Sequence, residues 1–212
     1  MFRFYFYNSD SVLRFNAKNF MMRRKEEVET YRSKLDRLKD QANQVLYYAE
    51  GEDLLKREDK KGSWNVVEVI HHLNLVNAHY LDQYPKDPEQ LADASPETKV
   101  KTSLLGRMLI KGVAPGDLSS GPSFKMRSPA STDPLKRQKK GYATVDQVVF
   151  RDFTDDLKKL EHHLQWLTQK AYEKRRIKTL LPIFSINAGE ALLLMIDHGL
   201  RHMNQAERII SK

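Results

Sequence analysis

Two histidines near the end of the chain have the spacing of a metal-binding pair. His198 and His202 lie four positions apart. On an α-helix such residues share one face and are separated by about one turn (~5.4 Å), so both imidazoles can reach one ion. Zinc-like ions accept imidazole nitrogens at about 2.0–2.1 Å, and the helix fixes the spacing before the ion binds. The pair alone is equally compatible with ordinary surface or partly buried histidines, so the metal hypothesis needs a third ligand.

The third ligand must come from another segment, where three histidines are available. His71 and His72 are adjacent, so on a helix they point about 100° apart and only one can face the interior. His72 shares its face with Val69 and Val76, which favours it over His71. His79, roughly two turns further along, is the competing ligand.

The composition and one glycine exclude several kinds of site. The chain has no cysteine, so a transition metal must be held by nitrogen and oxygen ligands, and disulfides and a cysteine nucleophile are excluded. A metalloprotease of the His-Glu-x-x-His kind needs a glutamate directly after the first histidine as general base. Gly199 stands in that position, which argues against this class.

Four amphipathic helices must position the histidines. Apolar residues recur at alternating spacings of three and four, the pattern of one apolar stripe per helix, in four ranges: 23–49, 65–84, 144–171 and 187–210. Three of these ranges begin with a capping-box pattern, formed by Asn65 with Glu68, Thr144 with Gln147, and Asn187 with Glu190. Because no convincing alternating strand pattern accompanies them, the sequence predicts an all-α four-helix bundle.

The connection between the second and third predicted helices, 85–141, is far longer than bundle connections usually are. It is rich in Pro, Ser, Gly and Lys. The apolar residues of 101–111 predict a short helix that Gly112 ends. We interpret the remainder, 115–140, as an ordered crossover or lid over one end of the bundle, with a disordered linker as the alternative.

The chain is expected to form one domain with an N-terminal extension. Its 212 residues are enough for one domain with a substantial core, which we place at 23–212. Residues 1–22 are aromatic and lack helical spacing. The alternating phenylalanines at 2–6 would suit one short strand, which has no partner in a helical bundle.

The charge of the chain raises the question of nucleic acid, since the formal net charge is +8 and the pI is near 9.5. The basic clusters lie on separate segments without interleaved aromatic residues, at 23–25, 136–140 and 174–176. No apolar run approaches the roughly 20 residues of a membrane-spanning helix, and 2–7 is too short for a secretory signal. We therefore expect a cytoplasmic protein that binds neither nucleic acid nor a membrane.

Two motifs at opposite ends of the chain resemble those of the DinB/YfiT-like superfamily. Residues 63–73, Ser-Trp-Asn-Val-Val-Glu-Val-Ile-His-His-Leu, resemble its Trp-Ser-x-x-Glu-x-x-x-His-Leu signature, in which the histidine is the first metal ligand. Residues 181–205, which contain the histidine pair, resemble the family's terminal helix. The resemblance covers 23–210 and implies an up-down-down-up bundle with one divalent ion held by His72, His198 and His202.

The chain departs from the family pattern in three features. Asn65 stands at the usual Ser or Thr cap, His71 adds a second histidine, and the connection is long and basic. These departures bear on the substrate rather than on the metal site.

Three imidazoles leave at least one position of a divalent ion open for water or substrate. Such an ion can lower the pKa of bound water to about 7 or activate a thiolate. The resemblance implies a metal-dependent hydrolase or a transferase that conjugates a low-molecular-weight thiol, such as bacillithiol or mycothiol, to an electrophile. We favour the transferase because a hydrolase needs a general base, and the one nearby carboxylate, Glu68, is interpreted as a capping residue with catalysis as its alternative.

Zinc is the expected ion, with nickel, iron and manganese as alternatives. Gln205, one turn beyond His202, is expected to contribute to cofactor binding by orienting a ligand or bound water. Trp64, Tyr47 and Tyr48 are interpreted as core residues, with the pocket mouth as the alternative.

The expected partners are a small molecule and a second copy of the chain. The resemblance implies a homodimer, and the three leucines at 192–194, which point in several directions on a helix, are compatible with one. The alternative function is a non-catalytic metal-binding module, for example of a stress response.

Overall fold

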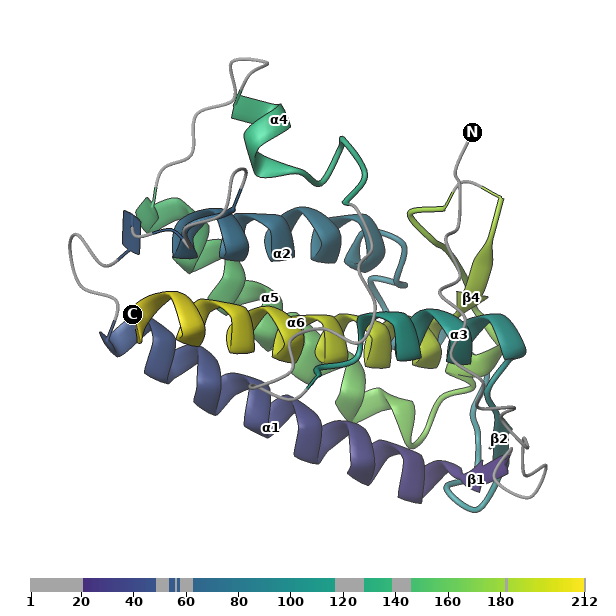
Figure 1. The fold of residues 1–212 in the computed structure, drawn as a ribbon. Coiled ribbons are helices and arrows are strands. Elements are labelled where there is room, and N and C mark those ends of the chain that lie inside the picture. The colour runs from purple at the N-terminus through teal and green to yellow at the C-terminus, as the bar shows by residue number, and fades with distance from the viewer. Residues whose placement is uncertain are drawn as a thin grey trace, which may run out of the picture.

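Four long helices form a bundle in the computed structural model (Figure 1), which describes residues 21–48, 54–55, 57, 63–116, 128–138, 146–181 and 183–211. The long helices are α1 (Arg24–Tyr48), α2 (Val66–Leu81), α5 (Asp146–Leu167) and α6 (Ala188–Ile210). α5 and α6 each pack against both α1 and α2. α1 and α6 run in one direction and α2 and α5 in the other, so the predicted up-down-down-up bundle is confirmed.

The core lies where the four apolar stripes meet. Leu35 and Leu38 of α1, Leu73 of α2 and Phe153 and Leu160 of α5 are each at most 1% exposed. Burying one such side chain stabilises the fold by about 1.5–3 kcal/mol relative to leaving it in water. The predicted stripes therefore face the interior.

Two of the three predicted capping boxes are confirmed. The side chain of Asn65 accepts from the backbone N–H of Glu68 at 2.8 Å, and the Glu68 carboxylate accepts from the Asn65 N–H at 3.0 Å. Asn187 and Glu190 make the same reciprocal pair at the start of α6, at 2.8 and 2.9 Å. The third signal begins at Thr144, which lies outside the described residues.

Two short antiparallel strand pairs lie at one end of the bundle, in stretches where the sequence showed no strand pattern. β1 (Met21–Arg23) pairs with β2 (Lys99–Lys101), and β3 (Arg176–Lys178) pairs with β4 (Ser185–Asn187). Each strand has three residues, which is too short for a period-two pattern to stand out. β1 includes two residues of the predicted N-terminal extension, whose boundary stays a prediction.

The long connection contains regular structure of its own: the 3-10 turn η3 (Pro88–Gln90), β2, α3 (Leu104–Val113) and α4 (Pro134–Gln138). α3 packs along α6, and α4 lies against α2 (Figure 1). The predicted short helix is thus present. Residues 117–127 and 139–145, on which the choice between a lid and a linker partly depends, lie outside the described residues.

The prediction that Gly112 ends the short helix was wrong. α3 continues through Gly112 to Val113, and the carbonyl of Gly112 accepts a hydrogen bond from Arg201 Nη1 at 2.7 Å. The helix ends where Pro115 follows Ala114, because a residue before proline is disfavoured in the helical conformation. Among the helices of the described ranges, none is both long and apolar enough to cross a membrane.

Candidate metal centre

Three histidines meet where α2 faces α6. His72 comes from α2, and His198 and His202 come from successive turns of α6. Nε2 of His198 lies 3.4 Å from Nε2 of His72 and 3.1 Å from Nε2 of His202, and one ligand atom of each ring lies within 4.8 Å of the others. The side chains are only 3%, 9% and 9% exposed. The structure therefore brings together the three residues that the sequence singled out.

The separations between these nitrogens fit a divalent ion. Ligands held tetrahedrally at about 2.0–2.1 Å from an ion lie roughly 3.3–3.4 Å from one another. The Nε2 separations of 3.4 and 3.1 Å in the structure are within a few tenths of an ångström of that value. Two of the three separations thus already lie near the value expected around one ion, and the ligand atoms of all three rings lie within 4.8 Å of one another, so the three residues could hold a metal ion.

Hydrogen bonds on the far side of two rings determine which nitrogen carries the proton. Nδ1 of His72 lies 2.6 Å from the carbonyl oxygen of Thr132, and a carbonyl only accepts, so this Nδ1 must donate. Nδ1 of His202 lies 2.9 Å from Oε1 of Gln205 and donates to it in the same way. In the neutral rings both Nε2 atoms then carry a lone pair toward the centre, which is the form that binds a metal.

Burial keeps these rings neutral. Burial lowers the pKa of His72 from 6.5 to about 4. It also lowers the pKa of His198 and of His202 well below 6.5, with a further lowering from the neighbouring rings. Neutral imidazole is the metal-binding form. Among the described residues, Nδ1 of His198 has no hydrogen-bond partner. The centre thus presents nitrogen lone pairs in a poorly hydrated place, an arrangement suited to a cation.

Three successive residues of α6 have separate roles. Asp197, 1% exposed, accepts from Nζ of Lys34 on α1 at 2.7 and 2.9 Å. His198 faces the metal centre, and Gly199 faces Leu38 of α1 so closely that an added Cβ would lie 2.7 Å from Leu38 Cδ2. A glutamate at 199 would have no room, which gives a packing reason for the absence of a His-Glu-x-x-His motif.

Trp64 joins the centre from the residues just before α2. Its ring lies 4.8 Å from that of His72 and 6.2 Å from that of His202, nearly parallel to the latter at 30°. Trp64 is partly buried and packs against the core, as interpreted from the sequence, and it also lies beside the histidines, which was the alternative interpretation. Tyr47 and Tyr48 were predicted as core residues and are instead 73% and 66% exposed at the end of α1.

The competing candidates lie elsewhere. Nε2 of His79 hydrogen-bonds to the carbonyl of Lys178 at 3.0 Å, and His71 is half-buried outside the triad. The Glu68 carboxylate accepts from the guanidinium of Arg57 at 2.5 and 2.7 Å in addition to its capping bond. Thr132 contacts the site through its backbone carbonyl, and no sequence pattern predicts this contact.

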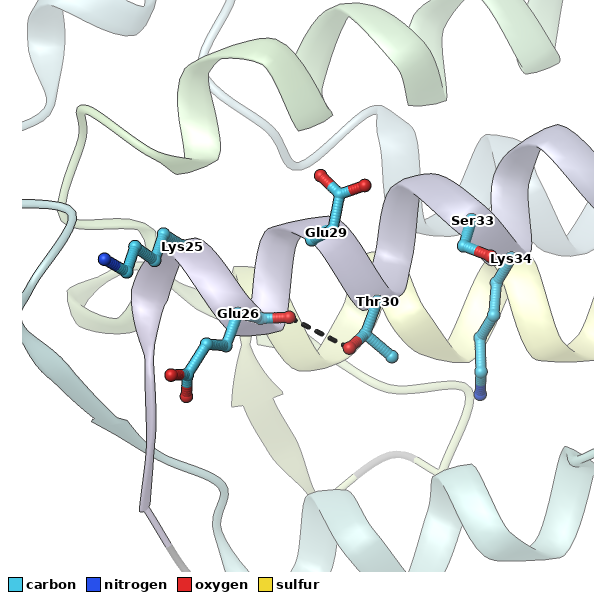
Figure 2. Close-up of a pocket in the computed structure, with 6 residues that line it drawn as sticks. All are labelled: Lys25, Glu26, Glu29, Thr30, Ser33 and Lys34. Atoms are coloured by element: carbon cyan, nitrogen blue, oxygen red, sulfur yellow. Dashed lines mark hydrogen bonds between the residues drawn. The ribbon is translucent and has the colours of Figure 1, made fainter.

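An open depression on the outer face of α1 is separate from the histidines (Figure 2). It is lined by Lys25, Glu26, Glu29, Thr30, Ser33 and Lys34. The Thr30 hydroxyl donates to the Glu26 carbonyl at 2.9 Å within the helix. Because both signs of charge occur together with hydroxyl side chains along this face, it has the character of a solvated helix surface.

Comparison with known proteins decides the family. A model of the DinB superfamily matches residues 34–206, which include α2, most of α6 and all three histidines. The chain belongs to the DinB superfamily. No curated protein and no solved structure matches this DinB-superfamily chain. The family that the two terminal motifs indicated is confirmed, and family membership together with the histidine cluster fits a metal-binding protein.

Proposed function

We propose that this chain is a metal-dependent enzyme that transfers a low-molecular-weight thiol to an electrophile, with one divalent ion held by Nε2 of His72, His198 and His202. The observation that carries the proposal is the convergence of three buried Nε2 atoms, two of which are fixed as lone-pair donors by hydrogen bonds at Nδ1. A bound ion with an open position would lower the pKa of a coordinated thiol and make it nucleophilic near neutral pH.

The surrounding residues have separate tasks in this proposal. Thr132 and Gln205 hold the rings of His72 and His202 in the ligating tautomer. Trp64 covers the imidazoles of His72 and His202 with an apolar ring, which limits the access of water to this side of the centre. The helices fix the spacing, so little ordering remains to be done when the ion binds.

The neighbouring carboxylates favour the transferase over a hydrolase. A hydrolase needs a general base that can take a proton from water. Glu68 is held by Asn65 and Arg57. Asp133, whose charge acts on His72, pairs with Lys136 Nζ at 3.0 Å and accepts from the Lys136 N–H at the start of α4. A thiol activated by the ion needs neither of them.

The first test is the metal itself. We expect the purified chain to bind about one equivalent of zinc, nickel, iron or manganese, with zinc the resident ion. His72→Ala, His198→Ala and His202→Ala should each weaken binding by about 100-fold or more, since each removes one of three ligands. His71→Ala and His79→Ala are matched controls from α2 and should retain the ion. Elemental analysis measures the bound metal, and chelator competition measures the affinity of each variant. A purified chain without bound metal would contradict the proposal.

The second test is turnover. The metal-loaded chain is incubated with bacillithiol and a chlorinated electrophile, and conjugate and hydrolysis product are separated by mass spectrometry. Conjugation by the wild-type chain that is lost in His198→Ala would support the transferase. Hydrolysis without conjugation would favour a hydrolase instead. Bound metal with neither product would make the chain a non-catalytic binding module.

We also propose that the chain is a homodimer, which size-exclusion chromatography with light scattering tests.

A further inference from the structure

The residue whose carbonyl accepts the hydrogen bond from Nδ1 of His72 belongs to the long connection rather than to the four-helix bundle. Thr132 lies 60 positions from His72 along the chain. It is only 2% exposed, although the preceding Ser131 is exposed. α4, which begins two residues later, packs against α2. The connection therefore places one buried residue directly behind a predicted metal ligand.

The carbonyl of Thr132 is fixed from both sides. Before it, the N–H of Thr132 donates to the carbonyl of Pro129 at 3.0 Å, and its hydroxyl reaches the same oxygen at 3.3 Å. After it, Asp133 caps α4: its carbonyl accepts from the N–H of Arg137 at 3.1 Å and its carboxylate from the N–H of Lys136 at 3.3 Å. The orientation of this carbonyl is thus set by a turn and a helix start.

We propose that the Pro129–Asp133 turn is a positioning element of the metal centre, and that seating of this turn against α2 and metal binding at the three histidines stabilise each other. The inference rests on the proposed metal site and assigns a role to the connection. A metal bound at Nε2 requires the proton of His72 at Nδ1, which is the form that donates to Thr132. Each event therefore favours the other, and such coupling is reciprocal.

Substitutions in the connection can test whether the Thr132 carbonyl contributes to metal binding. Thr132→Gly removes the buried side chain that anchors the turn and frees its backbone, while Ser131→Gly adds the same backbone freedom at the exposed neighbour. Partners that orient a metal ligand typically contribute about 10–100-fold to metal affinity. We expect Thr132→Gly to weaken zinc binding by about tenfold or more and Ser131→Gly to leave it nearly unchanged, measured by competition with a chromophoric chelator.

Hydrogen exchange of the wild-type chain tests the other direction of the coupling. Adding zinc should slow amide exchange in residues 128–138 more than in 88–101, a stretch that also lies in the connection but does not contribute to the triad. The excess protection should be absent in His198→Ala. This measurement decides the question even if Thr132→Gly does not fold.

The outcomes separate this inference from the proposed function. A wild-type chain that binds no zinc overturns both. Zinc binding with equal affinity in Thr132→Gly and Ser131→Gly, or without excess protection of 128–138, overturns the coupling and leaves the metal site standing.

Discussion

At the level of single residues, each side chain of the metal centre has more than one requirement to meet. His72 and His202 must present Nε2 to the centre and satisfy Nδ1 elsewhere, and Thr132 and Gln205 supply the acceptors. The two acceptors differ in kind. A backbone carbonyl cannot be deleted by substitution, whereas the amide oxygen of Gln205 can, so Gln205 offers the cleaner test of how much ligand orientation matters.

We expect Gln205→Leu to weaken zinc binding by about tenfold, because Nδ1 of His202 loses its acceptor and the ring its fixed tautomer. Gln205→Glu keeps an acceptor oxygen and should retain the wild-type affinity or exceed it. Chelator competition at pH 7.5 compares the three proteins. Equal affinities for Gln205→Leu and the wild type would show that the helix alone orients His202.

The sequence predicted the histidines but not all of their partners. His198, His202 and Gln205 share one helical face, so their proximity follows from the helix period. His72 was favoured over His71 by face and by the family register. The Thr132 carbonyl could not be predicted, because every residue has one and only the tertiary fold selects which one reaches the ring.

At the level of the elements, the apolar stripes and capping boxes predicted the helices because these signals are local. The sequence did not reveal hydrogen bonds in which a residue far along the chain satisfies the carbonyls at the end of a helix. Arg24 belongs to the basic cluster at 23–25. Its Nη1 donates to the carbonyls of Leu167 and Lys170 at 3.1 and 2.8 Å. It thus satisfies the C-terminal end of α5 from the start of α1. The strand pairs escaped prediction because each strand has only three residues, and the partners β1 and β2 are also far apart in sequence.

The close approach of α6 to α1 makes a prediction about Gly199. Gly199→Ala should lower the free energy of unfolding by about 1–3 kcal/mol, because the new methyl group would overlap Leu38, which is 1% exposed and has little space to move. Gly112→Ala in α3 is the matched control: a Cβ there meets nothing within 4 Å. That variant should be neutral or gain up to about 1 kcal/mol from helix propensity. Urea unfolding of both proteins checks the pair, and equal stabilities would show that α1 and α6 can move apart freely.

At the level of the whole molecule, the net charge of +8 overstates the basic surface. In the cluster at 23–25, Arg24 is 1% exposed and pairs with Glu173 at 2.8 Å. Its neighbours Arg23 and Lys25 both pair with Glu97, at 3.5 and 2.7 Å. Counting Lys and Arg from the sequence could not show that folding buries Arg24 and pairs its two neighbours with one carboxylate.

The stability of the molecule should depend on pH through a histidine outside the metal centre. His163 of α5 packs on Tyr84 with ring centroids 4.5 Å apart. Burial, with a smaller contribution from His162, lowers the pKa of His163 from 6.5 to about 4. Between these values the unfolded chain binds a proton that the folded chain does not, so stability falls as the pH is lowered from 7 toward 4.

We therefore expect the loss of Tm between pH 7 and pH 5 to be smaller by about 2–4 °C in His163→Phe than in the wild type. That shift corresponds to about 1 kcal/mol for a domain of this size, once screening of a partly exposed group is allowed for. His162→Phe, at the exposed neighbour, is the control and should keep the wild-type slope. Excess chelator in all samples removes metal occupancy as a variable, so the three metal-centre histidines contribute equally to every protein. Parallel pH profiles for His163→Phe and the wild type would mean that His163 takes up its proton in the folded state, which would require the contact with Tyr84 to open.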